Sequence, residues 1–343
     1  MTDTTTAGPR TGSDFAALSR RITEAGLMRR RPGYYALRFT LVGARAAATA
    51  TAFLVLGPTP WQLLVAVAAA FTYGQVALLA HDVAHRQVFR GRAASAAVGR
   101  LLGNLGIGMS YAAWQDKHTR HHAHPNHEGL DPDVEPGTIA FTPAQAARSR
   151  GINRFLIRHQ RLLFFPELSL AGVDLRVSSV RRLIDNPYPR RGLEAVLLAG
   201  HVLGYLAVVF LLLPWPLALG FVAVHQALFG IYLGSMFAPN HKGMEMPTGK
   251  MDRLRTQVVT SRNVSGGRFT DRPLHWLMGG LNHQIEHHLF PSMPTPNLRA
   301  ARPIVKQFCA ERGVSYHETG LIRSWQEILQ ALHEAGEPLR AEL

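Results

Sequence analysis

Four long apolar segments constrain the fold of this chain more than any other feature of its sequence. They cover residues 41–56, 61–80, 193–213 and 217–238, and each is long enough, or nearly long enough, to cross a bilayer as a helix. Short uncharged connections containing proline join the first segment to the second and the third to the fourth. We therefore predict an all-α integral membrane protein with four transmembrane helices in two hairpins.

The distribution of charge predicts which way the hairpins face. Every Lys and Arg except Arg45 lies outside the four segments, on the side opposite the two short turns. Since cytoplasmic loops carry an excess of these residues, both termini and a helical cap made of residues 81–190 and 239–343 are expected in the cytoplasm, at the inner (plasma) membrane. Arg45 and Glu194 lie near the cytoplasmic ends of their segments, and their side chains are expected to reach back to that face.

The rest of the chain is expected to be disordered, interfacial or helical. Residues 1–13 are rich in Thr and Gly and are predicted to be disordered, which leaves 14–343 as a single domain. An amphipathic helix over residues 14–27 suits a membrane surface, as do the mildly apolar stretches 93–113 and 155–175. Apolar residues at helical spacing in the C-terminal tail indicate further helices of the cap.

Composition excludes several kinds of site. The single cysteine, Cys309, rules out a disulfide framework, a Cys-ligated zinc site and an Fe–S cluster within this chain. No glycine loop of the nucleotide-binding kind is present, so electrons for any bound metal are expected from another protein. The net charge of +14 fits a membrane face attracted to anionic lipid and to an acidic electron donor, and no motif supports nucleic-acid binding.

Histidines recur in three short patterns. With 17 His in 343 residues a lone pair four residues apart carries little weight, but two patterns of three histidines in one chain are not expected by chance. Residues three and four apart share one face of a helix, so each pattern can direct its imidazoles at one point. The first pattern follows the second apolar segment and His241 follows the fourth, which places all of these imidazoles on one side of the membrane.

The number of histidines indicates two metal ions. Imidazole binds iron, zinc, copper and nickel, but eight imidazoles exceed what one tetrahedral zinc ion uses. Without the carboxylate pattern of soluble di-iron bundles, such a centre at a membrane face indicates O₂ activation on alkyl chains held in the bilayer, with no catalytic residue beyond the metal centre. The eight are His81, His85, His118, His121, His122, His241, His287 and His288.

These motifs resemble those of the integral-membrane fatty acid desaturases. His-Asp-x₂-His, His-x₂-His-His and Gln-x₂-His-His followed by Leu-Phe-Pro occur in that order, and the glutamine is similar to the third histidine box of front-end and bacterial acyl-lipid or acyl-CoA desaturases. The resemblance covers roughly residues 15–335. It implies a non-haem centre of two iron ions that uses O₂ and two electrons to introduce a cis double bond into a fatty acyl chain.

The resemblance also implies roles for individual residues. The eight histidines would hold the two ions, and Gln284 would stand where related enzymes carry a further histidine, although His283 competes for that position. The His-Pro-Gly-Gly motif of fused cytochrome b5 domains does not occur in the sequence, so a separate ferredoxin, or a cytochrome with its reductase, is the expected donor. Candidates for residues that orient the imidazoles or lie beside them are Asp82, His124, Asp131, Asp133, His283 and Glu286.

Two alternatives remain open. A membrane hydroxylase or related oxygenase on the same scaffold shares the hydrogen abstraction, so the histidine patterns do not distinguish it from a desaturase. A histidine-rich metal transporter would carry ligands along a path within the membrane, whereas these histidines gather beyond the ends of the apolar segments. His201 and His225 lie in the middle of such segments, and we expect them to be packed or hydrogen-bonded between helices.

Overall fold

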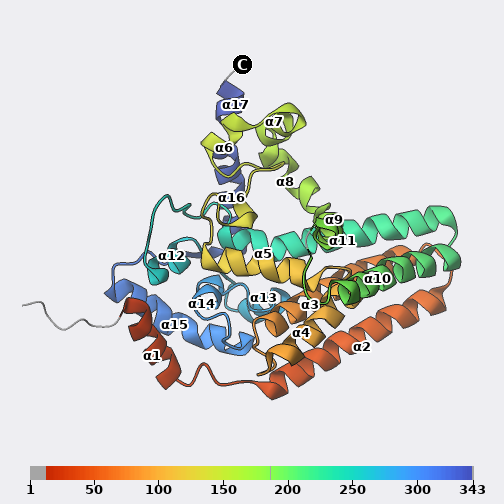
Figure 1. The fold of residues 1–343 in the computed structure, drawn as a ribbon, viewed down its shortest axis with the longest axis horizontal. Coiled ribbons are helices and arrows are strands. Elements are labelled where there is room, and N and C mark those ends of the chain that lie inside the picture. Colours follow the sequence, from red (N-terminus) through yellow and green to blue (C-terminus); the bar gives the residue numbers. More distant parts are fainter. Residues whose placement is uncertain (1–12, 186, 342–343) are drawn as a thin grey trace, which may run out of the picture.

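The computed structural model describes residues 13–185 and 187–341, and most of this part of the chain is helical (Figure 1). Among the described residues, four helices are long and apolar enough to cross a membrane, which confirms the main feature of the predicted fold class. They are α2 (Pro32–Leu56), α3 (Gln62–Ala84), α10 (Arg191–Leu212) and α11 (Trp215–His241). The predicted disordered segment 1–13 lies outside the described residues except for Ser13, whose hydroxyl accepts a hydrogen bond from the Ala16 N–H.

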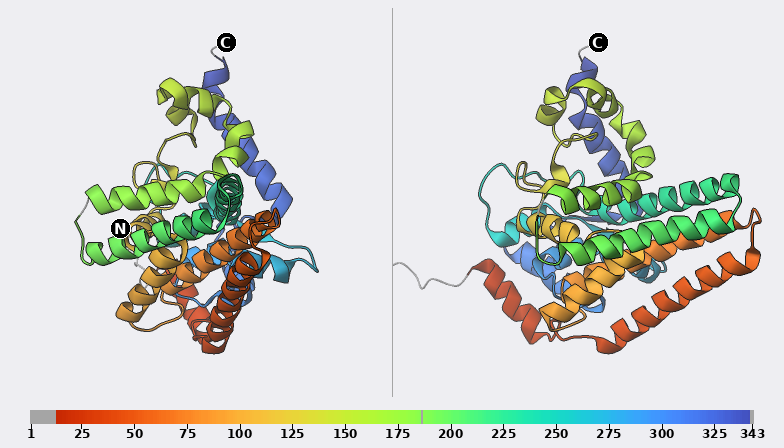
Figure 2. Two further views of the ribbon diagram at one scale, coloured as in Figure 1. Left: turned by 90° about the vertical axis from the view of Figure 1, so that its right-hand side faces the viewer. Right: turned by 45° about the vertical axis from the view of Figure 1, so that its right-hand side comes forward.

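Tight turns connect the long helices in pairs, at the end of the molecule opposite the short helices (Figures 1 and 2). The turn after α2 begins at Gly57, whose φ of +54° suits glycine. The Gln62 side chain at the start of α3 donates hydrogen bonds to the Phe53 and Gly57 carbonyls at 2.7 and 2.8 Å. The last carbonyls of a helix have no partner within it, so these bonds stabilise the turn.

The helices α3 and α11 run past the predicted spans and into the cap. The predicted segments end at residues 80 and 238, whereas α3 continues to Ala84 and α11 to His241. These two helices pack along each other. As a result, His81 and His241 are residues of regular helix at the cap ends of two neighbouring helices.

Short helices build the cap around these two ends. The predicted interfacial stretch 93–113 lies outside the four candidate spans and forms α4 and the π-helix η1, which pack against α3 and α10. Before α10 the cap contains α1 (Asp14–Glu24), α4 (Arg92–Arg100), η1 (Leu101–Ile107), α5 (Tyr111–Ala123), η2 (Pro132–Val134), α6 (Pro143–Arg148), α7 (Gly151–Arg158), α8 (Gln160–Leu168) and α9 (Ala171–Asp185). After α11 it contains α12 (Arg253–Val259), α13 (Asp271–Leu277), α14 (Gln284–Leu289), α15 (Thr295–Glu311), α16 (Leu321–Ala335) and α17 (Pro338–Ala341).

Two short strands are an exception to the all-α prediction. β1 (Asn263–Ser265) pairs in parallel with β2 (Glu318–Gly320), and three residues are too few to show the alternation by which strands are recognised in a sequence. The pairing fixes the segment that precedes the third histidine pattern. The Asn263 side-chain oxygen accepts a hydrogen bond from the Ile285 N–H at 2.9 Å, which positions the first turn of α14.

The first helix packs against the cap, so the prediction that it lies on a membrane surface is wrong. Leu18 and Ile22 are fully buried in a core shared with α12, α14 and α15. The Phe15 ring stacks on Phe290 with the ring centroids 5.7 Å apart, and Arg21 forms an ion pair with Glu311 of α15 at 2.8 Å. An apolar helix face does not distinguish a lipid partner from a protein partner, and here the partner is α15.

Glu194 interacts within the fold, and the prediction that its side chain extends back to the membrane face is wrong. The Glu194 side chain is fully buried and accepts hydrogen bonds from Arg100 Nε at 3.2 Å and from Ser110 Oγ at 2.7 Å. Neighbouring protein groups therefore stabilise the charge of Glu194, which the sequence suggested would be placed in water. The Arg45 guanidinium lies 4.4 Å from the centre of the Phe71 ring. It also lies 5.5 Å from the centre of the Trp276 ring of the cap helix α13, on the side to which it was expected to reach.

The two mid-span histidines behave as predicted. His201 Nδ1 lies 2.8 Å from the Leu105 carbonyl oxygen, and His225 Nδ1 lies 2.9 Å from the Tyr205 hydroxyl. Both side chains are buried. They pack between helices and are separate from the histidines of the cap.

Candidate metal centre

Four elements bring the histidine patterns together at the cap ends of the long helices. The first pattern ends α3, the second lies on α5, His241 ends α11, and the third lies on α14. The position of α5 is set at its start, where the Ser110 hydroxyl caps the helix by accepting a hydrogen bond from the Ala113 N–H at 3.2 Å. From there the histidines at positions 118, 121 and 122 fall on the face that looks toward α3 and α14.

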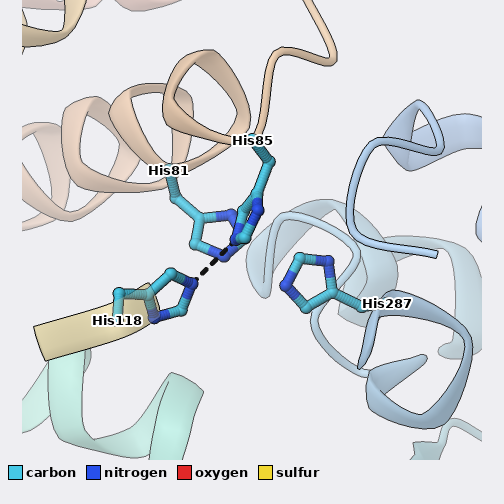
Figure 3. A group of neighbouring side chains, drawn as sticks. All are labelled: His81, His85, His118 and His287. Carbon is cyan, nitrogen blue, oxygen red and sulfur yellow. Dashed lines mark hydrogen bonds between the residues drawn. The ribbon is translucent and has the colours of Figure 1, made fainter. Parts of the chain in front are cut away.

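The first cluster joins α3, α5 and α14 (Figure 3). Potential ligand nitrogens of His81, His85, His118 and His287 all lie within 4.8 Å of one another. The Nε2 atoms of His85 and His118 are 2.7 Å apart. Within the described part of the chain, both ring nitrogens of His287 and the Nε2 of His81 are buried without a hydrogen-bond partner. Buried polar atoms of this kind are costly unless they bind something, and unprotonated imidazole nitrogens are good metal ligands.

The second cluster joins α5, α11 and α14. Ligand nitrogens of His121, His241 and His288 lie within 4.8 Å of one another, and the Nε2 atoms of His121 and His241 are 3.3 Å apart. The Nε2 of His288 is buried and has no hydrogen-bond partner among the described residues. The Gln284 side-chain nitrogen lies 2.8 Å from His241 Nε2, so Gln284 belongs to this cluster.

His122 lies between the two clusters. Its Nε2 is 3.1 Å from His118 Nε2 in the first cluster. Its ring stacks on that of His288 in the second, with the centroids 4.1 Å apart. The eight predicted histidines therefore form one continuous group with two centres, which is the arrangement expected for two neighbouring ions.

Hydrogen bonds on the outer side fix the orientation of several rings. His121 Nδ1 donates to Asp131 at 2.9 Å, and His241 Nδ1 donates to the Thr260 carbonyl at 2.9 Å. His288 Nδ1 donates to the Gln257 side-chain oxygen at 2.9 Å. A proton held on Nδ1 leaves the Nε2 lone pair free to face the cluster, as in metal sites of proteins. Of these partners, the sequence indicated Asp131 alone, because Gln257 and Thr260 belong to no recognisable motif.

The environment keeps five of the clustered imidazoles neutral. Burial, together with neighbouring imidazoles, holds the pKa of several rings well below the ordinary value of 6.5. A neutral imidazole has the lone pair that a metal ion requires, whereas a protonated one does not. The rings with strongly lowered pKa are His85, His118, His122, His287 and His288.

Carboxylates near the clusters differ in what they contact. Asp131 accepts from His121 as described, and Asp133 lies 3.5 Å from the same Nδ1 while it pairs with Lys117 at 2.8 Å. Asp82 lies 3.4 Å from His81 Nδ1 and accepts a shorter hydrogen bond from Thr295 Oγ1 at 2.9 Å. These three are placed where the sequence suggested, at the outer edges of the imidazoles.

The other three candidates lie away from the ligand nitrogens. Glu286 accepts hydrogen bonds from Asn263 at 2.7 Å and Tyr316 at 2.9 Å, and burial raises its pKa to about 7. His283 faces His275, with the ring centroids 5.2 Å apart, and not the clusters. His124 is exposed at the end of α5. The turn of the chain before α14 therefore directs Gln284 toward the second cluster and His283 away from it, into a buried position beside His275.

An apolar cavity of about 370 Å³ adjoins the clusters. His81, His118, His121, His241 and Gln284 contribute to its wall. Its remaining walls come mainly from α3, α5, α8, α9, α11 and η1 and are largely apolar, with Lys117, Asp133, Asp174 and Lys242 as the charged exceptions. Such a cavity fits a narrow hydrocarbon chain better than a polar metabolite. The fold and the site together define a helical membrane protein in which imidazoles suited to metal ions line one wall of an apolar cavity.

Comparisons with known proteins agree with this description. A family model described as fatty acid desaturase matches residues 58–320. Relatives include an acyl-lipid (9-3)-desaturase of Physcomitrium patens, 32% identical over 78% of this chain and 52% of that protein. The Delta(5) fatty acid desaturase fat-4 of Caenorhabditis elegans is 30% identical over 92% of this chain and 72% of its own length. Fatty acid desaturase 3 of Bos taurus is 31% identical over 94% and 73%.

The chain belongs to the fatty acid desaturase family. The predicted class of enzyme, an oxidoreductase that desaturates fatty acyl chains, is confirmed at this level. The match spans about half of the Physcomitrium patens protein and about three quarters of the other two.

Proposed function

We propose that this chain is an O₂-dependent front-end acyl desaturase that uses two iron ions. One observation carries the proposal: two adjoining groups of buried imidazole nitrogens lie at the ends of α3 and α11 and open onto an apolar cavity. The two ions and the substrate would then meet at the cavity wall that the imidazoles form. A hydroxylase shares this geometry, and the desaturase names of the relatives favour the desaturase.

The donor set fits the proposed ions. His81, His85, His118 and His287 would hold the first ion, and His121, His241 and His288 the second, with His122 between them. The unpartnered nitrogens of His81, His287 and His288 support this assignment, because they have no other role among the described residues. Once bound, the two ions would activate O₂, which is the oxidant that, with two electrons from the donor, would remove hydrogen from an unactivated methylene and be reduced to water.

The protein's own part in the reaction is to bind, orient and exclude water. The cavity would hold the acyl chain against the imidazole wall, with Trp114 stacked on His118 at a centroid distance of 4.3 Å to keep that ring in place. Asp131 would hold the proton of His121 on Nδ1. The apolar walls would keep bulk water from the reacting methylene, which protects the oxidant from side reactions.

Gln284 is proposed as the ninth group at the centre, in preference to His283. Its amide lies 2.8 Å from His241 Nε2, whereas His283 packs beside His275. The Asn240 side chain donates to the Gln284 side-chain oxygen at 3.2 Å and so restrains the amide. Gln284 would act at the ion shared by His121, His241 and His288, either as a ligand or through His241.

The orientation in the membrane and the reductant are also part of the proposal. The excess of Lys and Arg on the cap side favours a cytoplasmic cap at the inner membrane. The substrate would be the acyl chain of an acyl-CoA or an acyl lipid. A separate ferredoxin, or a cytochrome with its reductase, would deliver the electrons to the basic cap.

The proposal is tested by expression in a host that lacks the product, followed by fatty acid profiling with localisation of double bonds. The native chain is expected to yield a new double bond on the carboxyl side of an existing one, and His287→Ala and His288→Ala are expected to yield none. Iron per purified chain is expected to fall in both variants. His317→Gln is the matched control, since this imidazole pairs with Glu327 far from the clusters. A hydroxylated product would contradict the desaturase assignment, and unchanged iron in both variants would contradict the metal centre.

A further inference from the structure

We call the helices α7, α8 and α9 the arm. The outer face of the arm, which is turned away from the cavity, carries exposed apolar side chains. Eight large apolar residues on these helices are exposed, with Ile152 71% exposed and Leu162 76% exposed. Soluble surfaces seldom expose so much contiguous apolar area unless it meets a partner. The eight residues are Ile152, Phe155, Leu162, Phe165, Val173, Val177, Val180 and Ile184.

The arm runs across the membrane-spanning helices at their cap end. In Figure 1 the spans lie horizontally, and α7 and α8 rise from the cap at a wide angle to them. α9 is seen nearly end-on in Figure 1 and lengthwise in the left view of Figure 2. The chain passes from the end of α9 at Asp185 to the start of α10 at Arg191 within a few residues. The arm therefore joins the candidate span α10 directly, at the cap end of that helix.

The charge of the arm suits an anionic surface. Residues 151–185 contain six arginines and three carboxylates, a difference of +3. Arg161 and Arg181 are exposed between the apolar residues of α8 and α9. Apolar side chains alternating with arginine on helices that lie in one plane are typical of segments buried at the level of lipid head groups.

The inner face of the arm forms part of the cavity wall. Phe164 and Leu168 of α8 and Leu175 of α9 line the cavity that adjoins the histidines. The corner between α8 and α9 lies against Gly230 of α11, where a side chain would come within 2.9 Å of the Ser169 carbonyl oxygen. Glycine at this position allows α8 and α9 to lie directly on α11. One layer of helix therefore separates the cavity from whatever contacts the outer face.

We propose that the arm docks onto the anionic lipid leaflet at the cap end of the spans and that acyl chains of this leaflet reach the cavity across α8 and α9. The docking follows from the membrane-spanning helices and the outer face of the arm. The delivery of acyl chains rests in addition on the proposed desaturase function and makes a membrane lipid the substrate.

The docking is tested by the depth of single fluorophores in vesicles. The only native thiol, Cys309, is buried, so Leu162→Cys and Ile184→Cys are suitable for labelling with a thiol-reactive fluorophore. The full-length protein is reconstituted in phosphatidylcholine vesicles with and without phosphatidylglycerol, and nitroxide-labelled lipids serve as quenchers. Both labels are expected to be quenched by nitroxides near the head groups, and more strongly with phosphatidylglycerol. Lys306→Cys on α15, exposed and away from the arm, is the control. Equal quenching at all three positions would overturn the docking.

The delivery of acyl chains is tested by turnover in two environments. Leu162→Glu places a charge on the outer face without filling or emptying the core, so thermal stability in detergent is expected to match that of the native chain. Turnover on phospholipid acyl chains in vesicles is expected to fall several-fold, while turnover on an acyl-CoA in detergent stays the same. Ile322→Glu, also exposed but on α16, is expected to leave both rates unchanged. Equal loss in vesicles and detergent, or no loss in either, would overturn delivery through the arm without affecting the depth measurement.

Discussion

Asp131 controls the tautomer of one imidazole in the second cluster. It is fully buried, and it accepts hydrogen bonds both from His121 Nδ1 at 2.9 Å and from the Asn126 N–H at 2.8 Å. Asp131→Asn is expected to weaken metal binding about 10–100-fold, because the amide holds the proton on Nδ1 less firmly. Iron retention during dialysis against a graded chelator measures this change. Asp116→Asn, on the exposed side of α5, is the control, and equal retention by both variants would contradict the role of Asp131.

We predict opposite effects on the iron centre for substitutions of Gln284 and of its neighbour His283. Gln284→Ala is expected to lower activity strongly and to change the electronic or Mössbauer spectrum of the bound iron, because its amide contacts His241. His283→Ala is expected to leave that spectrum unchanged, since its ring faces His275. A spectrum altered by His283→Ala but not by Gln284→Ala would reverse the assignment.

The grouping of the histidines was predictable because spacing along a helix shows which residues share a face. Sequence spacing does not show what meets the outer side of a ring. Gln257 contacts His288 only because α12 packs against α14, and Thr260 contributes a backbone carbonyl that any residue would offer. Those contacts depend on the tertiary fold, so no local pattern predicts them.

At the scale of elements, Glu194 links the start of α10 to the start of α5. Its carboxylate accepts from Arg100, from the Ser110 hydroxyl and from the Ala112 N–H at 3.3 Å, and Ser110 caps the helix that carries the second histidine pattern. Glu194→Ala is expected to lower the free energy of unfolding by about 3–5 kcal/mol, because it leaves the Arg100 guanidinium without its partner.

Thermal unfolding in detergent measures this loss. Glu194→Gln keeps an acceptor for Ser110 and is expected to recover part of the stability and most of the iron content. If Glu194→Ala unfolds at the same temperature as the native chain, the link between α10 and α5 contributes nothing to stability.

Helices with a long, uniformly apolar sequence were predicted correctly. Elements whose position depends on which part of the protein they pack against were not. The four apolar helices needed only length and hydropathy. The first helix was assigned to a lipid surface, but Phe290 and the core of α15 cover its apolar face. The strands β1 and β2 form because residues far apart in the sequence meet, and three residues carry no periodic signal.

For the molecule as a whole, the metal-free protein is expected to lose stability as the pH falls below about 6.5. Burial and neighbouring imidazoles lower the pKa of five clustered histidines in the folded state, whereas the unfolded chain keeps the ordinary value of 6.5. Between the two values the unfolded chain binds more protons, so the free energy of unfolding decreases with decreasing pH.

The midpoint of thermal unfolding in detergent is expected to stay level above about pH 6.5 and to decrease below it. His287→Leu removes one of the titrating groups, so its midpoint is expected to depend less steeply on pH. A native midpoint that rises on acidification would show that the cluster is protonated in the folded state.

The helices that are long and apolar enough to cross a bilayer also carry imidazoles of the proposed metal centre. His81 and His241 are residues of α3 and α11 themselves, with no loop between the span and the imidazole. A change in hydrocarbon thickness tilts spanning helices, and a stiff helix passes that tilt to its end. We therefore expect the spacing of the imidazoles to depend on the thickness of the surrounding lipid, so that the proposed enzyme would respond to a physical property of the bilayer around it.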